Sequence, residues 1–174
     1  MFFSSMFSSL KIQGLVALPG SAEYELSLSR VYHRHCLTEH KPLAVVVVSG
    51  TRDISLTILF CKSHKFSFSI LGGGVNPSGT SISGKVVIDL RRLKYVHVDQ
   101  ETGRALVGAG MTFKELDYEL EGQGRCVPGP LFCHVGVAGA FLGGGWGFLS
   151  KVGKTKKKGV GVFVFSFPDA WDAL

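Results

Sequence analysis

The sequence has no apolar run long enough to cross a bilayer, no Cys-x-x-Cys pair and no internal repeat. A helical membrane span needs about 20 consecutive apolar residues, so membrane insertion is not predicted. Four widely spaced cysteines in a chain of 174 residues do not suggest a disulfide framework. The first residues also lack a basic segment ahead of their apolar residues, which argues against a signal peptide. Cytoplasmic and secreted locations both stay open.

The chain is poor in charged residues, and its positive charge is local. Charged residues make up 18% of the sequence and hydrophobic residues 45%, a balance typical of a globular protein. The net charge is +6, but five lysines lie between positions 151 and 158, and without them it is +1. No aromatic residues are interleaved with this run, so we expect a solvated segment and no nucleic-acid partner.

The region after Lys41 predicts a β-α-β unit. Residues 43–48 form a continuous β-branched run, which is typical of a buried strand. Residues 51–65 fit a helix, and Phe66, Phe68 and Ile70 alternate with serines as in a strand. Two strands joined by a helix are expected to be parallel.

A more β-rich unit is expected further along. Residues 85–90, 94–100 and 104–110 are three strand candidates, followed by a helix over 112–124. Thr112 and Glu115 form a capping-box pattern at the start of this helix, and Gly122 is predicted to take the left-handed position at its end.

Two glycine-rich segments punctuate this order, "LGGGVNPSGTSIS" and "HVGVAGAFLGGGWGFLS". Glycine lets consecutive backbone amides approach an anion such as a phosphate. A Rossmann fingerprint fails because Pro77 stands at the third glycine position and no helix follows. A Walker A loop fails because Val86 follows Lys85 where a hydroxyl is required.

The residues from about Lys41 to Gly153 resemble the FAD-linked oxidases of the vanillyl-alcohol oxidase and berberine bridge enzyme superfamily, with their PCMH-type FAD-binding domain. The matching stretches are "LGGGVNPSGTSIS", "VVIDL", "ALVGAGMTFKELDYEL" and "HVGVAGAFLGGGWGFLS", in the order that the family has them. One triple glycine is weak evidence. Both segments in order, with the linking strands, are strong evidence.

The resemblance implies an α+β fold of two α/β subdomains with FAD extended between them. It also implies hydride transfer from a small organic substrate to FAD, which molecular oxygen usually reoxidises. No residue is assigned as the catalytic base, and no metal is expected. The implied cofactor-binding residues are Gly72, Gly73, Gly74, Val75, Asn76, Ser78, Gly79, Thr80, Ser81, His134, Val135, Gly136, Gly139, Gly143, Gly144 and Gly145.

The sequence departs from the family pattern at the positions of covalent attachment. Val75 replaces the histidine that often binds the flavin, so we expect FAD to be held non-covalently. Leu71 replaces an arginine near the phosphates. Phe132 stands where doubly linked members have a cysteine, and Cys133 comes one residue late, so we expect it to be unlinked.

The end of the sequence also departs from the pattern. We expect an N-terminal extension over 1–40, a partial FAD-binding domain over 41–153, and an atypical tail over 154–174. The second subdomain is expected to be incomplete and the substrate domain absent. The alternative to a working oxidoreductase is therefore a truncated, non-catalytic remnant that binds FAD weakly or not at all.

A short polar stretch, "YHRHCLTEH", contains His33, His35, Cys36 and His40. As a zinc site it lacks a second ligand cluster at a known spacing. The preferred interpretation is that these are solvated polar residues ahead of the first strand.

Overall fold

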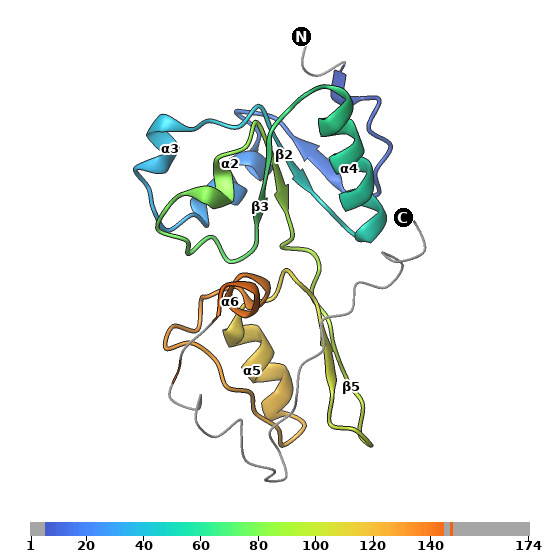
Figure 1. Ribbon diagram of the computed structural model, residues 1–174, viewed down its shortest axis with the longest axis vertical. Coiled ribbons are helices and arrows are strands. Elements are labelled where there is room, and N and C mark those ends of the chain that lie inside the picture. Colours follow the sequence, from blue (N-terminus) through green and yellow to red (C-terminus); the bar gives the residue numbers. More distant parts are fainter. Residues whose placement is uncertain (1–5, 145–146, 148–174) are drawn as a thin grey trace.

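A computed structural model describes residues 6–144 and Gly147. These residues form two lobes, a first lobe of residues 6–90 and a second lobe of residues 91–144 (Figure 1). In chain order the elements are β1 (Leu15–Ala17), α2 (Ala22–Ser29), α3 (Cys36–Glu39), β2 (Ala44–Val47), α4 (Thr51–Ser63), β3 (Phe68–Leu71), the 3-10 turn η1 (Thr80–Ile82), β4 (Val86–Asp89), β5 (Val96–Val98), β6 (Ala105–Val107), α5 (Phe113–Glu121) and α6 (Val137–Gly143).

The first lobe is built on a four-stranded sheet in the order β1-β2-β4-β3. Strands β2 and β3 are parallel, as the β-α-β pattern predicts, but β4 lies between them and pairs with both. The "VVIDL" strand therefore returns to the first sheet and does not belong to the second unit. A buried, continuously β-branched strand at the centre of a sheet explains this position.

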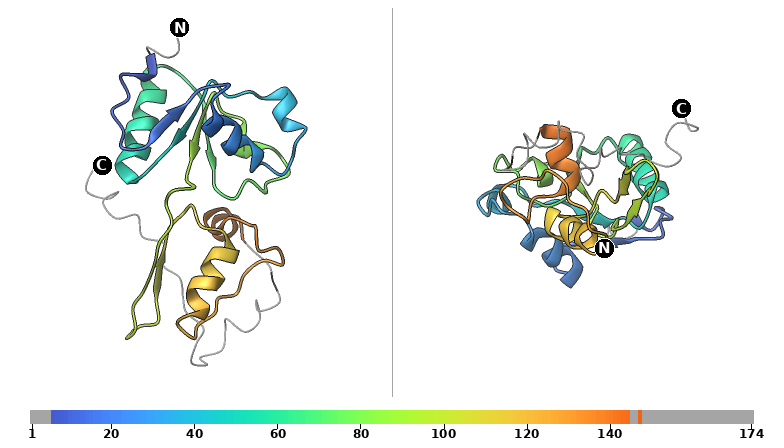
Figure 2. Two further views of the ribbon diagram at one scale, coloured as in Figure 1. Left: turned by 180° about the vertical axis from the view of Figure 1, so that it is seen from behind. Right: turned by 90° about the horizontal axis from the view of Figure 1, so that it is seen from below.

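Each face of this sheet is covered by different helices (Figure 2). Val45 and Val47 of β2 pack with Tyr24 and Leu28 of α2 on one face. On the other face lie Val46 and the α4 residues Phe60 and Cys61, among other buried side chains. All four residues of β2 are buried, which is why its sequence carries no polar alternation.

The strand predicted from the alternation of Phe68 and Ile70 with serines is confirmed as β3. The structure shows which face of this strand is buried. Ser69 and Leu71 are buried, while Phe68 and Ile70 are 41% and 51% exposed. β3 lies at the edge of the sheet, and its alternating apolar side chains are only partly covered.

Residues before position 41 contribute to the first lobe. β1 pairs with β2 in antiparallel fashion, and α2 covers one face of the sheet. The carboxylate of Asp53, at the start of α4, is almost fully buried and accepts hydrogen bonds from the amides of Gln13, Gly14 and Ser49 at 2.8–2.9 Å. The described part of the segment that the sequence suggested as an extension, residues 6–40, is thus tied into the same lobe.

The second lobe consists of the β5–β6 hairpin and two helices. The predicted capping box of α5 is confirmed, with Thr112 and Glu115 bonded in both directions. The prediction for Gly122 is wrong: its φ is −58°, and Gly124 has the positive φ of +63°. The amide of Arg125 closes onto the carbonyl of Leu120, so the left-handed residue falls two positions later.

The second glycine segment is not an open loop throughout, because residues 137–143 form α6. Gly145 and the lysine-rich tail from residue 154 lie outside the described residues. Within the described part of the chain, no helix has the length and apolar character needed to cross a membrane.

Candidate functional site

The two glycine segments meet where the lobes join. A Cβ added to Gly73 would lie 2.3 Å from the amide nitrogen of Gly136, and one added to Gly136 would lie 2.4 Å from that of Gly73. Only glycine permits this backbone approach. The resemblance named both residues, and the structure brings them into contact across 63 positions of sequence (136 minus 73).

The first glycine segment has a fixed conformation. Gly74 and Gly79 have φ values of +73° and +68°, which disfavour other residues. Between them, the side chain of Asn76 accepts a hydrogen bond from the amide of Ser78 at 2.8 Å. This local bond is an Asx turn, and it shapes the loop before η1 begins.

The loop presents polar groups that the fold does not use. Among residues 6–144, no acceptor is found for the amides of Gly73, Gly74, Val75 and Asn76. In the same part of the chain, the hydroxyls of Ser78, Thr80 and Ser81 make no hydrogen bond. Successive unpaired amides and hydroxyls form the donor set that a phosphate group requires.

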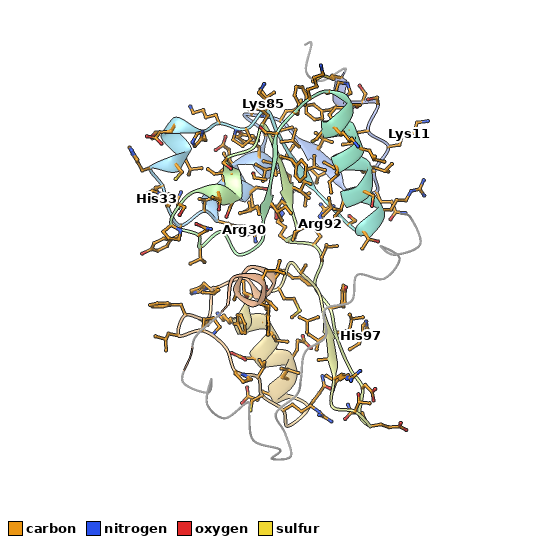
Figure 3. The ribbon with its side chains drawn as sticks, viewed as in Figure 1. Lys11, Arg30, His33, Lys85, Arg92 and His97 are labelled. Carbon is orange, nitrogen blue, oxygen red and sulfur yellow. The ribbon has the colours of Figure 1, made fainter. Side chains whose placement is uncertain are left out.

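An arginine at the end of α2, just after its last residue, supports this loop. Arg30 donates to the carbonyl of Gly72 at 2.5 Å and to the buried carboxylate of Asp89 at 2.7 Å. Figure 3 shows Arg30 at the edge of the first lobe that faces the second. A cation is therefore present beside the loop although Leu71 replaces the family arginine. Sequence spacing gave no signal for it, because Arg30 lies 42 positions before Gly72.

Asp89 links Arg30 to a second arginine, Arg91. Its carboxylate also accepts from the amide of Arg91 at 2.9 Å, and Nε of Arg91 lies 3.7 Å away. The guanidinium of Arg91 bonds in turn to Glu23 of α2. Asp89, the acidic residue of the "VIDL" strand, thus joins α2 to the end of β4, beside the glycine loop.

A cavity of about 360 Å³ lies between the lobes, and its lining does not include the residues of the first glycine loop. Ala109 lines it, and its carbonyl oxygen lies 4.0 Å from the Cβ position of Gly72. Arg92 and Lys94 add positive charge, and Figure 3 labels Arg92 at the junction of the two lobes. The lining residues are Ser49, Gly50, Thr51, Arg92, Leu93, Lys94, Tyr95, His97, Leu106, Val107, Ala109, Ala138 and Leu142.

The second glycine segment is held to the second lobe by main-chain bonds. The amide of Phe113 donates to the carbonyl of Val135, and the amide of Val137 donates to that of Met111. These bonds place Gly136 against Gly73. The backbone of His134 follows this path, with its carbonyl 3.1 Å from the Cβ position of Gly73, while its side chain is exposed.

The remaining predicted residues of the second segment that the structure describes, Gly139, Gly143 and Gly144, lie on α6 or just after it. A side chain added at Gly139 or Gly143 would meet no atom within 4 Å, so their surroundings are open. Gly144 has a φ of +79° and ends the helix. These glycines are not in contact with the first loop, in contrast to Gly136.

The first glycine loop offers unpaired amides that suit phosphate groups. The cavity between the lobes is separate from these amides and mostly apolar, which suits flat rings, and it carries Arg92 and Lys94 in its lining. FAD has both phosphate groups and flat rings. The hydrogen-bond donors of the first loop therefore suit the phosphates of this cofactor. No group of three or more residues able to hold a metal occurs in the described part of the chain.

Comparison with known proteins identifies this arrangement. Residues 42–165 match the family model of the FAD binding domain. The chain is 32% identical over 151 residues to an FAD-linked oxidoreductase of Arthroderma benhamiae, covering 84% of this chain and 30% of that protein. It is 27% identical over 148 residues to (R)-6-hydroxynicotine oxidase of Paenarthrobacter nicotinovorans, covering 84% and 32%.

Solved structures agree. The berberine bridge enzyme-like 1 protein of Physcomitrella patens superposes with a TM-score of 0.75 at 26% identity, covering 85% of this chain and 32% of that one. The α+β architecture expected from the resemblance is thus confirmed. The chain spans about 30% of the length of the curated relatives named here. The chain belongs to the family of the FAD binding domain, and the proteins it is similar to include an FAD-linked oxidoreductase and a berberine bridge enzyme-like protein.

Proposed function

We propose that this chain binds FAD across the crevice between its lobes, with the first glycine loop on the pyrophosphate. The observation that carries the proposal is the row of unpaired amides from Gly73 to Asn76, within a loop whose shape two left-handed glycines fix. Ser78, Thr80 and Ser81 add hydroxyl donors. The described part of the second segment, residues 134–144, lies along the flavin side of the cofactor in this proposal.

We further propose that FAD is bound without a covalent link. Val75 occupies the position of the family histidine, and an alkyl side chain cannot form a bond to the flavin. Cys133 is exposed and its carbonyl accepts from the amide of Lys114, which fixes its backbone in the segment before Val135. This arrangement gives no support for the one-residue shift that a cysteinyl link would need.

In a protein with the full length of the relatives, we propose that the activity is oxidation of a small organic substrate. FAD supplies the hydride acceptor, and molecular oxygen is the proposed final oxidant. The names of the relatives, which include oxidases and oxidoreductases, support this reaction class. The role proposed for the described residues is to hold and orient the cofactor. The unpaired amides and Arg30 offset the charge of the phosphates. The apolar cavity excludes water from the flavin ring.

The phosphate assignment can be tested by titrating the purified chain with FAD and following quenching of flavin fluorescence. We expect riboflavin, which lacks phosphates, to bind at least about tenfold more weakly, since each charge-assisted hydrogen bond contributes about 1.5–3 kcal/mol. ADP should compete with FAD more strongly than adenosine does. Equal affinity for FAD and riboflavin would contradict a phosphate-binding loop.

A further inference from the structure

A cysteine and a histidine are paired behind the first glycine loop. Cys36 is the first residue of α3, and its Sγ lies 2.8 Å from Nδ1 of His33. Cys36 is buried and His33 half-buried, so the sequence-based interpretation of this stretch as solvated polar residues is wrong for the thiol. Figure 3 shows His33 at the outer end of the first lobe, beneath α3.

The thiol also touches the glycine loop. A Cβ added to Gly79 would lie 2.2 Å from Sγ of Cys36 and 2.9 Å from its Cβ. The sulfur therefore fills the space that a side chain at position 79 would need. An atom bonded to this sulfur has to find room between the imidazole of His33 and the backbone of Gly79.

The chain segment from Arg30 to Cys36 supports the loop at three points. Arg30 donates to the carbonyl of Gly72, the amide of Tyr32 donates to that of Gly74 at 2.9 Å, and Cys36 packs on Gly79. The segment thus runs along the back of the whole loop. A change in volume at Cys36 would press on Gly79, which lies three residues after Asn76, the last of the unpaired amides.

We propose that Cys36 and His33 form an oxidation site, and that modification of Cys36 displaces the first glycine loop. The oxidant is hydrogen peroxide. This pairing of a thiol with an imidazole is the arrangement that generates a nucleophilic thiolate in proteins. The consequence for FAD affinity rests on the proposed function, whereas the reactivity of the thiol and the movement of the loop do not.

The reaction balances as a two-electron oxidation. His33, with Nδ1 as the acceptor, takes the proton from the Cys36 thiol, and the thiolate attacks one oxygen of hydrogen peroxide. The S–O bond forms as the O–O bond breaks, and the departing hydroxide takes the proton from His33 to give water. Sulfur ends as a sulfenic acid, which adds one oxygen atom to the side chain.

The test begins with the variant Cys126→Ser/Cys133→Ser, which removes the two exposed thiols. Cys36 and Cys61 remain, and both are buried. Cys61 is the reference: no imidazole among the described residues is hydrogen-bonded to its sulfur, and burial raises its pKa to about 11. The folded 174-residue chain is treated with hydrogen peroxide and dimedone, and peptide mass spectrometry follows the sulfenic adduct at each cysteine.

We expect Cys36 to form the adduct at least tenfold faster than Cys61, and His33→Asn to slow it about tenfold. Equal rates at Cys36 and Cys61 would overturn the proposal, as would an unchanged rate in a folded His33→Asn variant. If that variant does not fold, the comparison of Cys36 with Cys61 decides alone.

Loop displacement is read by amide hydrogen exchange, which needs no flavin. After oxidation, exchange over residues 74–82 should accelerate several-fold, and the treated Cys36→Ser/Cys126→Ser/Cys133→Ser variant should show no change. Unchanged exchange after oxidation would refute the coupling. FAD affinity is expected to fall at least tenfold with the same dependence on Cys36. A chain that never binds FAD would refute the proposed function. The hydrogen-exchange result would then decide whether oxidation of Cys36 displaces the loop.

Discussion

Gly73 and Gly136 lie so close together that neither has room for a Cβ. The position of that atom on one glycine is within 2.4 Å of the other's amide nitrogen. This contact joins the two lobes at the point where the candidate phosphate loop meets the segment before α6. The two glycine-rich motifs of the sequence are therefore two sides of one structural joint.

Substitution at this joint should separate the lobes. We expect Gly73→Ala to lower the free energy of unfolding by about 2 kcal/mol, because added atoms in a packed site force backbone shifts that typically cost 1–3 kcal/mol. Gly139→Ala is the matched control, since its Cβ would meet no atom within 4 Å. In a helix it should be neutral or stabilise by up to about 1 kcal/mol. Urea denaturation measures both, and equal effects of the two variants would contradict the contact.

Arg30 should matter for stability and for cofactor binding together. Arg30→Met leaves the fully buried Asp89 without its 2.7 Å partner, and loss of one member of a buried pair typically costs 3–5 kcal/mol. Because Arg30 is itself partly exposed, we expect about 2–3 kcal/mol in denaturant unfolding. FAD affinity should fall as well, since the carbonyl of Gly72 loses its donor. Arg30→Lys retains the charge and should lose less than Arg30→Met on both measurements; equal losses of the two variants would contradict a contribution of the positive charge itself.

Asp53 should hold the N-terminal strand in the first lobe. Asp53→Asn replaces one accepting oxygen by an NH₂ group that faces a backbone donor, and an unsatisfied buried donor costs about 1–3 kcal/mol. We expect the free energy of unfolding to fall by that amount. Amide hydrogen exchange at Gln13 and Gly14 should accelerate before exchange elsewhere. Ser55→Ala, on the exposed side of α4, serves as the control and should change neither. Wild-type exchange at residues 13 and 14 in Asp53→Asn would show that the carboxylate does not secure them.

The capping box of α5 should make stability depend on pH. Burial favours a higher pKa for Glu115, but hydrogen bonds from Lys94 and Thr112 outweigh it and lower the pKa. A lowered pKa stabilises the fold fully above the ordinary glutamate value of about 4.3, and this contribution is lost as the pH falls through the folded-state pKa. Glu115→Gln should therefore destabilise at pH 7, and its difference from wild type should shrink toward pH 3. A difference independent of pH would exclude a charge effect.

Local rules predicted the elements that carry local signals. The buried run over 43–48, the helix over 51–65 and the Thr112–Glu115 box all formed as expected because each depends on neighbours in sequence. The left-handed residue at the end of α5 was predicted at the wrong glycine. Two glycines, Gly122 and Gly124, lie close together there, and only one of them takes the left-handed conformation. Tertiary closure by the amide of Arg125 selects the second.

The supports of the site could not be predicted in the same way. Nothing in the spacing of Arg30 or Cys36 indicates that a loop more than 40 residues later will lie on them. The pairing of β4 between β2 and β3 brings these segments together, and periodicity does not encode strand order. The family resemblance named the glycines on the ligand side, and the structure added the residues behind them.

The central claim is that this chain holds FAD without a covalent bond. The most direct test is a visible absorption spectrum of protein purified in the presence of FAD, freed of unbound flavin by gel filtration and then precipitated with acid. The account predicts yellow protein that releases all of its flavin into the acid supernatant. Colourless, folded protein would contradict FAD binding by this crevice, and flavin retained in the pellet would contradict the non-covalent attachment.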